Sequence, residues 1–252
     1  MANQVTTRDS EVLLVERAGV NQDIVVLTMN RPAARNALNP ALRQALSAEL
    51  TAADQDPATR VVILTGNGTV FCSGLDLKEL GEGVESASMS WFFHDSIGKP
   101  IIAALNGTAV AGGFELVLAC DLVVAADGAK IGIPEVKRGL LSAGGGTTLS
   151  NLIPRAAALE LGLTGDLISV ARAQQLGLIN QVVPADQVRP AAVGLAERIA
   201  ANAPLSLAIT KKLMRDGRLP TTEETRTVFN SVDAREGAAS FAERRQPQWS
   251  GK

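Results

Sequence analysis

Residues 107–121, GTAVAGGFELVLACD, place a single glutamate, Glu115, inside an otherwise apolar run. A carboxylate is costly to bury unless it is paired or used in chemistry. The glycine pair at 112–113 marks a helix start, and glycine lets another group approach the backbone closely. The first N–H groups of a helix lack intrahelical partners and can stabilise negative charge on a bound oxygen. The stretch indicates either a functional acid beside an amide site or a glutamate that caps its own helix.

Strands alternate with helices on both sides of this stretch, which predicts an α/β fold with parallel crossovers. A helix is expected over 39–56, because Asn39 can cap it and Pro40 suits its first turn. Buried strands are predicted within residues 11–30, 60–66, 99–107, 121–127 and 129–134, with a loop at 67–74. The strand pattern stops near residue 186. This predicts a core over 1–186 and a helical subdomain over 187–252 that serves oligomer formation or covers the site.

The composition argues against several classes of protein. The chain has 252 residues, of which 46% are hydrophobic and 20% charged, as is typical of a globular domain. The formal net charge of −2 favours neither nucleic acid nor an anionic membrane surface as a partner. No apolar stretch reaches the roughly 18 residues of a membrane span, and the N-terminus lacks a secretory pattern. Cys72 and Cys120 show no metal-ligand spacing, so a reducing, cytoplasmic location is expected.

A second acid, Glu135, follows Pro134 at the end of a predicted strand, twenty residues after Glu115. Loop carboxylates are mostly solvated, so a plain surface role is one interpretation. Two carboxylates held beside one small molecule can also act in turn as acid and base. Both interpretations of Glu135 stay open on these residues alone.

A second candidate amide site lies in GNGTVFCSGLDLKEL, residues 66–80. Gly74 ends a loop there, and Leu75-Asp76-Leu77 begins a predicted helix, so backbone N–H groups could face a ligand oxygen. The stretch contains neither a P-loop nor a dinucleotide-binding glycine pattern. It also lacks the G-x-S-x-G pattern of a nucleophile elbow.

The single histidine, His94, is expected to pack or hydrogen-bond at the end of a helix. A Ser-His-Asp or Cys-His mechanism would have to use this residue. Metal binding by one isolated histidine is not expected, so no metal site is predicted.

Four motifs together resemble the enoyl-CoA hydratase/isomerase (crotonase) superfamily, and they occur in the family's order. They are NRPAARNAL (30–38), GTVFCSGLDLKEL (68–80), KPIIAALNGTAVAGGFELVLACD (99–121) and IGIPEVKRGLLSAGGGT (131–147). Residues 156–184 and 233–252 are also similar to the family, so the resemblance covers nearly the whole chain. It implies a crotonase (ClpP-like) spiral of β-β-α units with a C-terminal helical region. It also implies assembly as homotrimers or as hexamers that are dimers of trimers.

The resemblance further implies an acyl-CoA thioester substrate, as in fatty acid metabolism and β-oxidation, and no cofactor beyond the coenzyme A of the substrate. By position, the oxyanion hole is formed by the backbone N–H groups of Leu75 and Gly112. Glu115 and Glu135 match the two glutamates of the hydratases. The residues that would bind CoA are Arg35, Ala37, Ser73, Gly74, Asp76 and Leu77.

The implied reaction is the reversible addition of water to a trans-2-enoyl-CoA. Glu115 would activate water as general base, and Glu135 would protonate the α-carbon. The sequence departs from the family at Ser142-Ala143, where Pro-Gly is common in a segment that borders the acyl pocket. Alternatives are enoyl-CoA isomerisation, a carnitinyl-CoA dehydratase-like reaction, and acyl-CoA binding without catalysis. Acyl-chain length is not predicted.

Overall fold

The computed structural model describes residues 11–76 and 97–252. The chain begins with an antiparallel pair, β1 (Leu13–Ala18) and β2 (Ile24–Met29), joined by a turn closed by the Gln22 N–H to the Gly19 carbonyl. The strands predicted within residues 11–30 are therefore confirmed.

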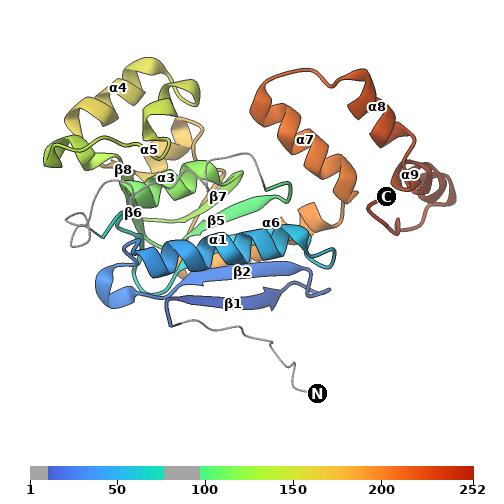
Figure 1. Cartoon of the computed structure of the whole chain (residues 1–252), viewed down its shortest axis with the longest axis horizontal. Helices are drawn as coiled ribbons and strands as arrows, with labels where there is room; N and C mark the ends of the chain where they lie inside the picture. The colour runs from blue at the N-terminus through green and yellow to red at the C-terminus, as the bar shows by residue number, and fades with distance from the viewer. Residues whose placement is uncertain (1–10, 77–96) are drawn as a thin grey trace.

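A six-stranded sheet has the order β1-β2-β3-β5-β7-β10, and every pair beyond the first is parallel. Its remaining strands are β3 (Val61–Gly66), β5 (Ile101–Leu105), β7 (Leu122–Ala126) and β10 (Gln181–Val183). The inner strands are buried almost throughout, which explains their continuous apolar runs. Two helices pack on the sheet: α1 (Pro40–Gln55) against β1 and β2, and α6 (Val188–Ala200) against β2, β3, β5 and β7 (Figure 1).

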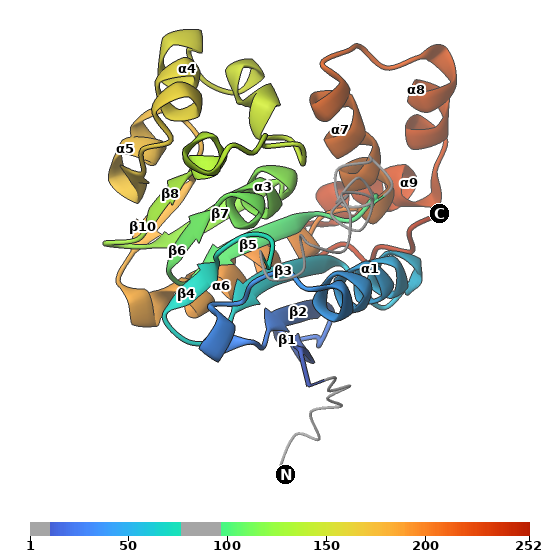
Figure 2. The ribbon, with the colours of Figure 1, turned by 60° about the vertical axis from the view of Figure 1, so that its left-hand side comes forward.

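A second sheet of four short strands has the order β4-β6-β8-β9. The strands are β4 (Val70–Cys72), β6 (Thr108–Val110), β8 (Lys130–Gly132) and β9 (Ile168–Ser169). Successive strands go to alternate sheets, so β3 is followed by β4, β5 by β6, and β7 by β8. Helix α3 (Gly112–Ala119) follows β6 (Figure 2). This alternation is the β-β-α spiral that was expected from the resemblance.

One local prediction was wrong, and one strand was not predicted. The loop expected at 67–74 contains β4, and the segment between β5 and the glycine pair contains β6. Each of these strands has three residues, which is too short for an alternating pattern to be recognised.

Short helices and the C-terminal region complete the chain. The remaining elements are η1 (Pro32–Ala34), η4 (Pro134–Arg138), η5 (Gly146–Asn151), α4 (Arg155–Thr164), α5 (Val170–Gln175), η6 (Ala185–Gln187), α7 (Pro204–Asp216), α8 (Thr222–Phe229) and α9 (Val232–Glu243). Helices α7, α8 and α9 stand beside the sheet region (Figures 1 and 2). The predicted division into a core and a helical subdomain after residue 186 stays a prediction. Helix α6 lies beyond that division in the sequence and packs on the sheet.

Helix α7 is attached to the core through Asp121, the second residue after the C-terminal end of α3. The Asp121 carboxylate accepts hydrogen bonds from the Ile101 N–H at 2.7 Å and from Arg215 Nε at 2.9 Å, and it pairs with Lys211 Nζ at 2.9 Å. No side chain of α7 is itself buried. Polar contacts therefore contribute a large share of this attachment. Within the described ranges, none of the helices has both the length and the apolar character that a membrane crossing requires.

Candidate active site

Two segments named for CoA binding lie side by side. The Ser73 N–H donates to the Arg35 carbonyl at 3.1 Å, the Leu38 N–H donates to the Gly74 carbonyl at 2.8 Å, and the Asp76 N–H donates to the Leu38 carbonyl at 3.4 Å. These bonds join the end of β4 to the turn after η1. They bring together residues that are about forty positions apart in the sequence.

Several of these residues also have structural partners. The Asp76 carboxylate pairs with the Arg31 guanidinium at 3.1 Å, and Ala37 is buried. Arg35 has a positive φ of 52° at the end of η1, which turns the chain toward Leu38. Leu77 lies outside the described residues, as does His94. A helix was expected to begin at Leu75, and only its first two residues, Leu75 and Asp76, lie within the described residues.

The two candidate oxyanion-hole amides are neighbours in space. A Cβ atom added to Gly112 would lie 3.6 Å from the Leu75 nitrogen, and one added to Gly74 would lie 3.1 Å from the Gly112 nitrogen. Among residues 11–76 and 97–252, neither the Leu75 N–H nor the Gly112 N–H has a recorded hydrogen-bond acceptor. Two unpaired donors that lie this close can bind one oxygen atom between them.

Backbone conformation on both sides sets this geometry. Gly74 has φ of 88°, and a Cβ there would lie 2.8 Å from the Ala111 Cβ, so only glycine fits without a shift. Ala111 has φ of 53° and ψ of −133°, which is a sparsely populated region for a residue with a side chain. The strained turn at Ala111 starts α3 so that the Gly112 N–H is the first unpaired donor of the helix.

Glu115 is 5% exposed, and the chain holds it through one oxygen atom. Its Oε1 accepts hydrogen bonds from the backbone N–H groups of Gly144 and Gly146, both at 2.9 Å. Burial raises the pKa of Glu115, and the negative charge of Glu135 raises it further, whereas the two glycine amides oppose the shift. No hydrogen bond to Oε2 is recorded from any residue that the structure describes. That oxygen is therefore available to a ligand or a water molecule.

Glu135 is the second carboxylate of the site. It lies in η4, is 8% exposed, and its negative charge raises the pKa of Glu115. Its Oε2 is fully buried and has no hydrogen-bond partner within the described part of the chain. A buried polar atom without a partner is costly and is typical of a group whose partner is a bound molecule.

The glycine run after Ser142-Ala143 has a role that the sequence did not reveal. The resemblance implied that this segment borders the acyl pocket, whereas the structure shows that Gly144 and Gly146 bind Glu115 Oε1. Gly146 also lacks room for a side chain, because a Cβ there would lie 2.6 Å from the Ser142 Cβ. The cluster of glycines indicated a special backbone, but it could not indicate Glu115 as the partner, because Glu115 is about thirty residues away in the sequence.

A cavity of about 250 Å³ lies elsewhere, where α7 meets the loops before β3 and β5. Asp54, Arg60 and Lys99 are among its lining residues, and Glu115 and Glu135 are not. Lys99 Nζ already donates to the Ala53 carbonyl, and Arg60 donates to the Ala200 carbonyl. We interpret this cavity as a packing gap between the core and α7.

Comparisons with known proteins show the family of the chain. The family model described as Enoyl-CoA hydratase/isomerase matches residues 19–252. The chain is 36% identical to the 2,3-dehydroadipyl-CoA hydratase of Escherichia coli (strain K12), over 95% of this chain and 99% of that protein. It is 39% identical to enoyl-CoA hydratase EchA19 of Mycobacterium tuberculosis (strain ATCC 25618 / H37Rv), over 94% of this chain and 95% of that protein. A crystal structure of enoyl-CoA hydratase from Mycobacterium tuberculosis H37Rv superposes with a TM-score of 0.88, with 43% identity and coverage of 96% of this chain and 100% of that one. The chain belongs to the enoyl-CoA hydratase/isomerase family.

Proposed function

We propose that this enzyme is a hydro-lyase that adds water reversibly to a trans-2-enoyl-CoA thioester. The observation that carries the proposal is the placement of two buried carboxylates, Glu115 and Glu135, of which the charge of one raises the pKa of the other. The described part of the chain also offers two adjacent amides that have no acceptor among its residues. The relatives named as hydratases support the same reaction.

The amide pair stabilises the charge that develops during the reaction. The thioester carbonyl oxygen accepts hydrogen bonds from the Leu75 and Gly112 N–H groups, and it becomes more negative as water adds at the β-carbon. One such donor is typically worth about 3 kcal/mol of transition-state stabilisation.

The carboxylates handle the protons. Glu115, fixed through Oε1, uses Oε2 to take one proton from water while the water oxygen forms its bond to the β-carbon. Glu135 acts as the general acid and gives a proton to the α-carbon, which completes the 3-hydroxyacyl thioester. Acid–base help of this kind contributes roughly 10²–10⁴ in rate. Because the atoms and protons balance with water and two carboxyl groups, we propose that the reaction needs no cofactor besides the coenzyme A of the substrate.

The CoA moiety is proposed to lie against the joined segments 35–37 and 73–77. Backbone hydrogen bonds hold Arg35 beside Ser73, and Gly74 is adjacent to Leu75 in the chain. A CoA molecule that binds along these joined segments therefore lies next to the Leu75 amide of the oxyanion hole. Arg35, Ala37, Ser73, Gly74, Asp76 and Leu77 remain the residues proposed for this contact.

The direct test is hydration of crotonyl-CoA and longer trans-2-enoyl-CoA thioesters, followed by loss of the conjugated enoyl absorbance. We expect turnover by the natural sequence and a loss of at least about 100-fold in kcat for Glu115→Gln and for Glu135→Gln. Glu160→Gln, at an exposed glutamate of α4, is the matched control and should leave turnover unchanged. Product mass separates the alternatives, because hydration adds one water and isomerisation adds none. Full activity in both site variants would contradict the assignment of the two acids.

The assembly and the location are part of the proposal. Large apolar side chains are exposed on the C-terminal helices and their connections: Met214, Leu219, Phe229, Val232 and Phe241. Further copies of this chain are the proposed cover, in a trimer or a dimer of trimers. The free, buried thiols of Cys72 and Cys120 support the proposed cytoplasmic location.

A further inference from the structure

Cys72 is the last residue of β4, two positions before Gly74 and three before Leu75, and it is completely buried. Its thiol has a partner on each side. Sγ accepts a hydrogen bond from the Gly74 N–H at 3.4 Å, and the S–H group donates to the Asn36 carbonyl at 3.1 Å. The thiol thus links the peptide that precedes the Leu75 amide to the turn after η1.

The same residue packs against the other half of the amide pair. A Cβ added to Gly113 would lie 2.3 Å from the Cys72 carbonyl oxygen and 2.8 Å from the Cys72 Cβ. The first turn of α3, which provides the Gly112 N–H, therefore lies directly on Cys72. One residue contacts both segments that form the candidate oxyanion hole.

The acceptor of the thiol is firmly held. The Asn36 side chain is fully buried, and its Nδ2 donates to the Asn67 and Val70 carbonyls at 3.0 and 2.7 Å. Its Oδ1 accepts from the Arg31 N–H at 2.9 Å. Because these bonds hold Asn36 in place, the Cys72 thiol connects the Gly74 peptide to a rigid support.

We propose that Cys72 is a positioning residue that, through its thiol, sets the Leu75 amide at the correct distance and angle from the Gly112 amide. This inference rests on the proposed function, because it assigns the two amides to one thioester oxygen. Burial raises the pKa of the Cys72 thiol to about 12, so the neutral S–H stays available to donate to Asn36.

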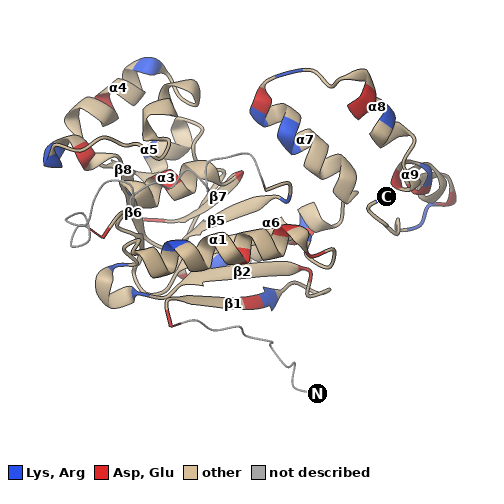
Figure 3. Ribbon diagram, in the orientation of Figure 1, with Lys and Arg blue, Asp and Glu red and all other residues tan. Residues whose placement is uncertain are grey.

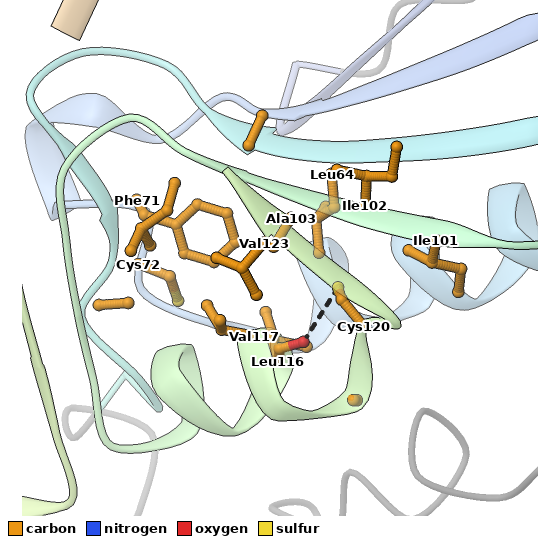
Figure 4. Packing of buried hydrophobic residues seen from close by; sticks show 14 of the residues in the cluster. Leu64, Phe71, Cys72, Ile101, Ile102, Ala103, Leu116, Val117, Cys120 and Val123 are labelled. Carbon is orange, nitrogen blue, oxygen red and sulfur yellow. Dashed lines mark hydrogen bonds between the residues drawn. The ribbon is translucent and has the colours of Figure 1, made fainter. Parts of the chain in front are cut away.

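The chain contains a matched control, Cys120, at the far end of α3. Figure 4 shows Cys72 beside Phe71 and Cys120 at the end of the helix, with the Cys120 thiol bonded to the Leu116 carbonyl at 3.3 Å. Both cysteines are free and buried, so their replacement by alanine removes the same group from the same kind of environment. Only Cys72 touches the amide segments.

The experiment compares Cys72→Ala, Cys72→Ser and Cys120→Ala with the natural sequence, by two readouts. The first is the infrared shift of the thioester C=O stretch when butyryl-CoA binds, since this saturated thioester cannot be hydrated and reports only the hydrogen bonds to its carbonyl. The second is kcat and KM for crotonyl-CoA.

We expect Cys72→Ala to reduce the carbonyl shift and to lower kcat about tenfold, with KM changed less than about twofold, because small displacements in an active site reduce rates strongly. Cys72→Ser should restore most of both signals, since its hydroxyl can accept from Gly74 and donate to Asn36. Cys120→Ala should match the natural sequence.

A Cys72→Ala variant with an unreduced carbonyl shift would overturn the inference. A Cys72→Ser variant whose carbonyl shift and kcat are reduced as much as those of Cys72→Ala would also overturn it. Failure of the proposed hydration is a separate result. If the natural sequence shifts the carbonyl of butyryl-CoA but hydrates no enoyl-CoA, the hydratase proposal fails, and the comparison of carbonyl shifts still decides the role of Cys72.

Discussion

Glu115 is stabilised by backbone amides and, within the described residues, has no cationic partner. Two hydrogen bonds from Gly144 and Gly146 favour its charged form, but burial and the charge of Glu135 outweigh them, so its pKa is raised. A raised pKa makes the carboxylate a stronger base, which suits Glu115 to accepting a proton from water. The same placement costs folding free energy whenever Glu115 is ionised.

This cost gives the stability a predictable pH dependence. Below the ordinary pKa of 4.5, Glu115 is protonated in both the folded and the unfolded chain. As the pH rises from there through the raised pKa, the unfolded chain releases its proton first, so the free energy of unfolding decreases and then levels off. Each pKa unit of difference is worth about 1.4 kcal/mol.

Urea unfolding of the natural sequence and of Glu115→Gln across this pH window measures the effect. We expect the difference in the free energy of unfolding to grow with pH in favour of Glu115→Gln, whose amide oxygen can still accept from Gly144 and Gly146. Parallel pH profiles for the two proteins would contradict the raised pKa.

At the scale of single residues, the sequence predicted the two acids and both glycine-bearing amide sites. The glycine pair by itself does not distinguish Gly112 from Gly113, and the choice of Gly112 came from the family resemblance. The structure separates them, because a side chain on Gly113 would collide with the Cys72 backbone, whereas one on Gly112 would meet only ordinary contacts of 3.6 Å. The sequence could not predict the positive φ of Ala111, since alanine rarely adopts that conformation.

At the scale of elements, long patterned segments were predictable and short ones were not. Helix α1 was expected within 39–56 and lies at Pro40–Gln55, and its Asn39 side chain accepts from the Leu42 N–H as a cap should. Strands β4 and β6 were missed, although they place the two candidate amides. Their positions depend on pairing with each other across the second sheet, which no local pattern records.

The attachment of α7 yields a prediction at this scale. Asp121 joins Lys211 and Arg215 of α7 to the core, and the Asp121 and Lys211 side chains are only 16% and 12% exposed. Asp121→Ala removes the carboxylate that these cations and the Ile101 N–H share, and leaves Lys211 and Arg215 only their bonds to the Lys99 and Ala119 carbonyls. The loss should cost about 2 kcal/mol, somewhat less than for a fully buried pair. Amide hydrogen exchange should show faster exchange in α7 than in α1.

Asp166→Ala is the control for this variant, because the Asp166–Lys137 pair lies on the surface with side chains 72% and 49% exposed. Such a pair is worth at most about 1 kcal/mol, and often much less. Equal losses of stability in the two variants would show that Asp121 does not anchor α7.

At the scale of the whole molecule, the C-terminal helices leave several large apolar side chains uncovered in a single chain. Figure 3 shows Lys/Arg and Asp/Glu residues interspersed along α7, α8 and α9, while the large apolar side chains of the same region are exposed. Helical spacing after residue 186 predicted these helices. The helical spacing could not predict what covers these helices, because the sequence pattern of a helix does not identify the surface that packs against it.

Sedimentation tests the proposed assembly. We expect a mass three or six times that of one chain, and a smaller mass for the double variant Phe229→Ser with Phe241→Ser, because those side chains are 75% and 87% exposed in the single chain. Val20→Ser, at an equally exposed apolar residue of the β1–β2 turn, should leave the mass unchanged. A single-chain mass for the natural sequence would contradict the proposed oligomer.

The central claim is that the Leu75 and Gly112 amides bind one thioester oxygen, and Gly112→Ala tests it most directly. A methyl group there would occupy space 3.6 Å from the Leu75 nitrogen, beside the Gly112 N–H, without a contact close enough to disturb the fold. The measurement is kcat for crotonyl-CoA hydration, with the unfolding midpoint and the affinity for free coenzyme A as controls. The account predicts a fall in kcat of about 10²–10³ with both controls unchanged; a folded, CoA-binding Gly112→Ala enzyme that turns over at the natural rate would contradict it.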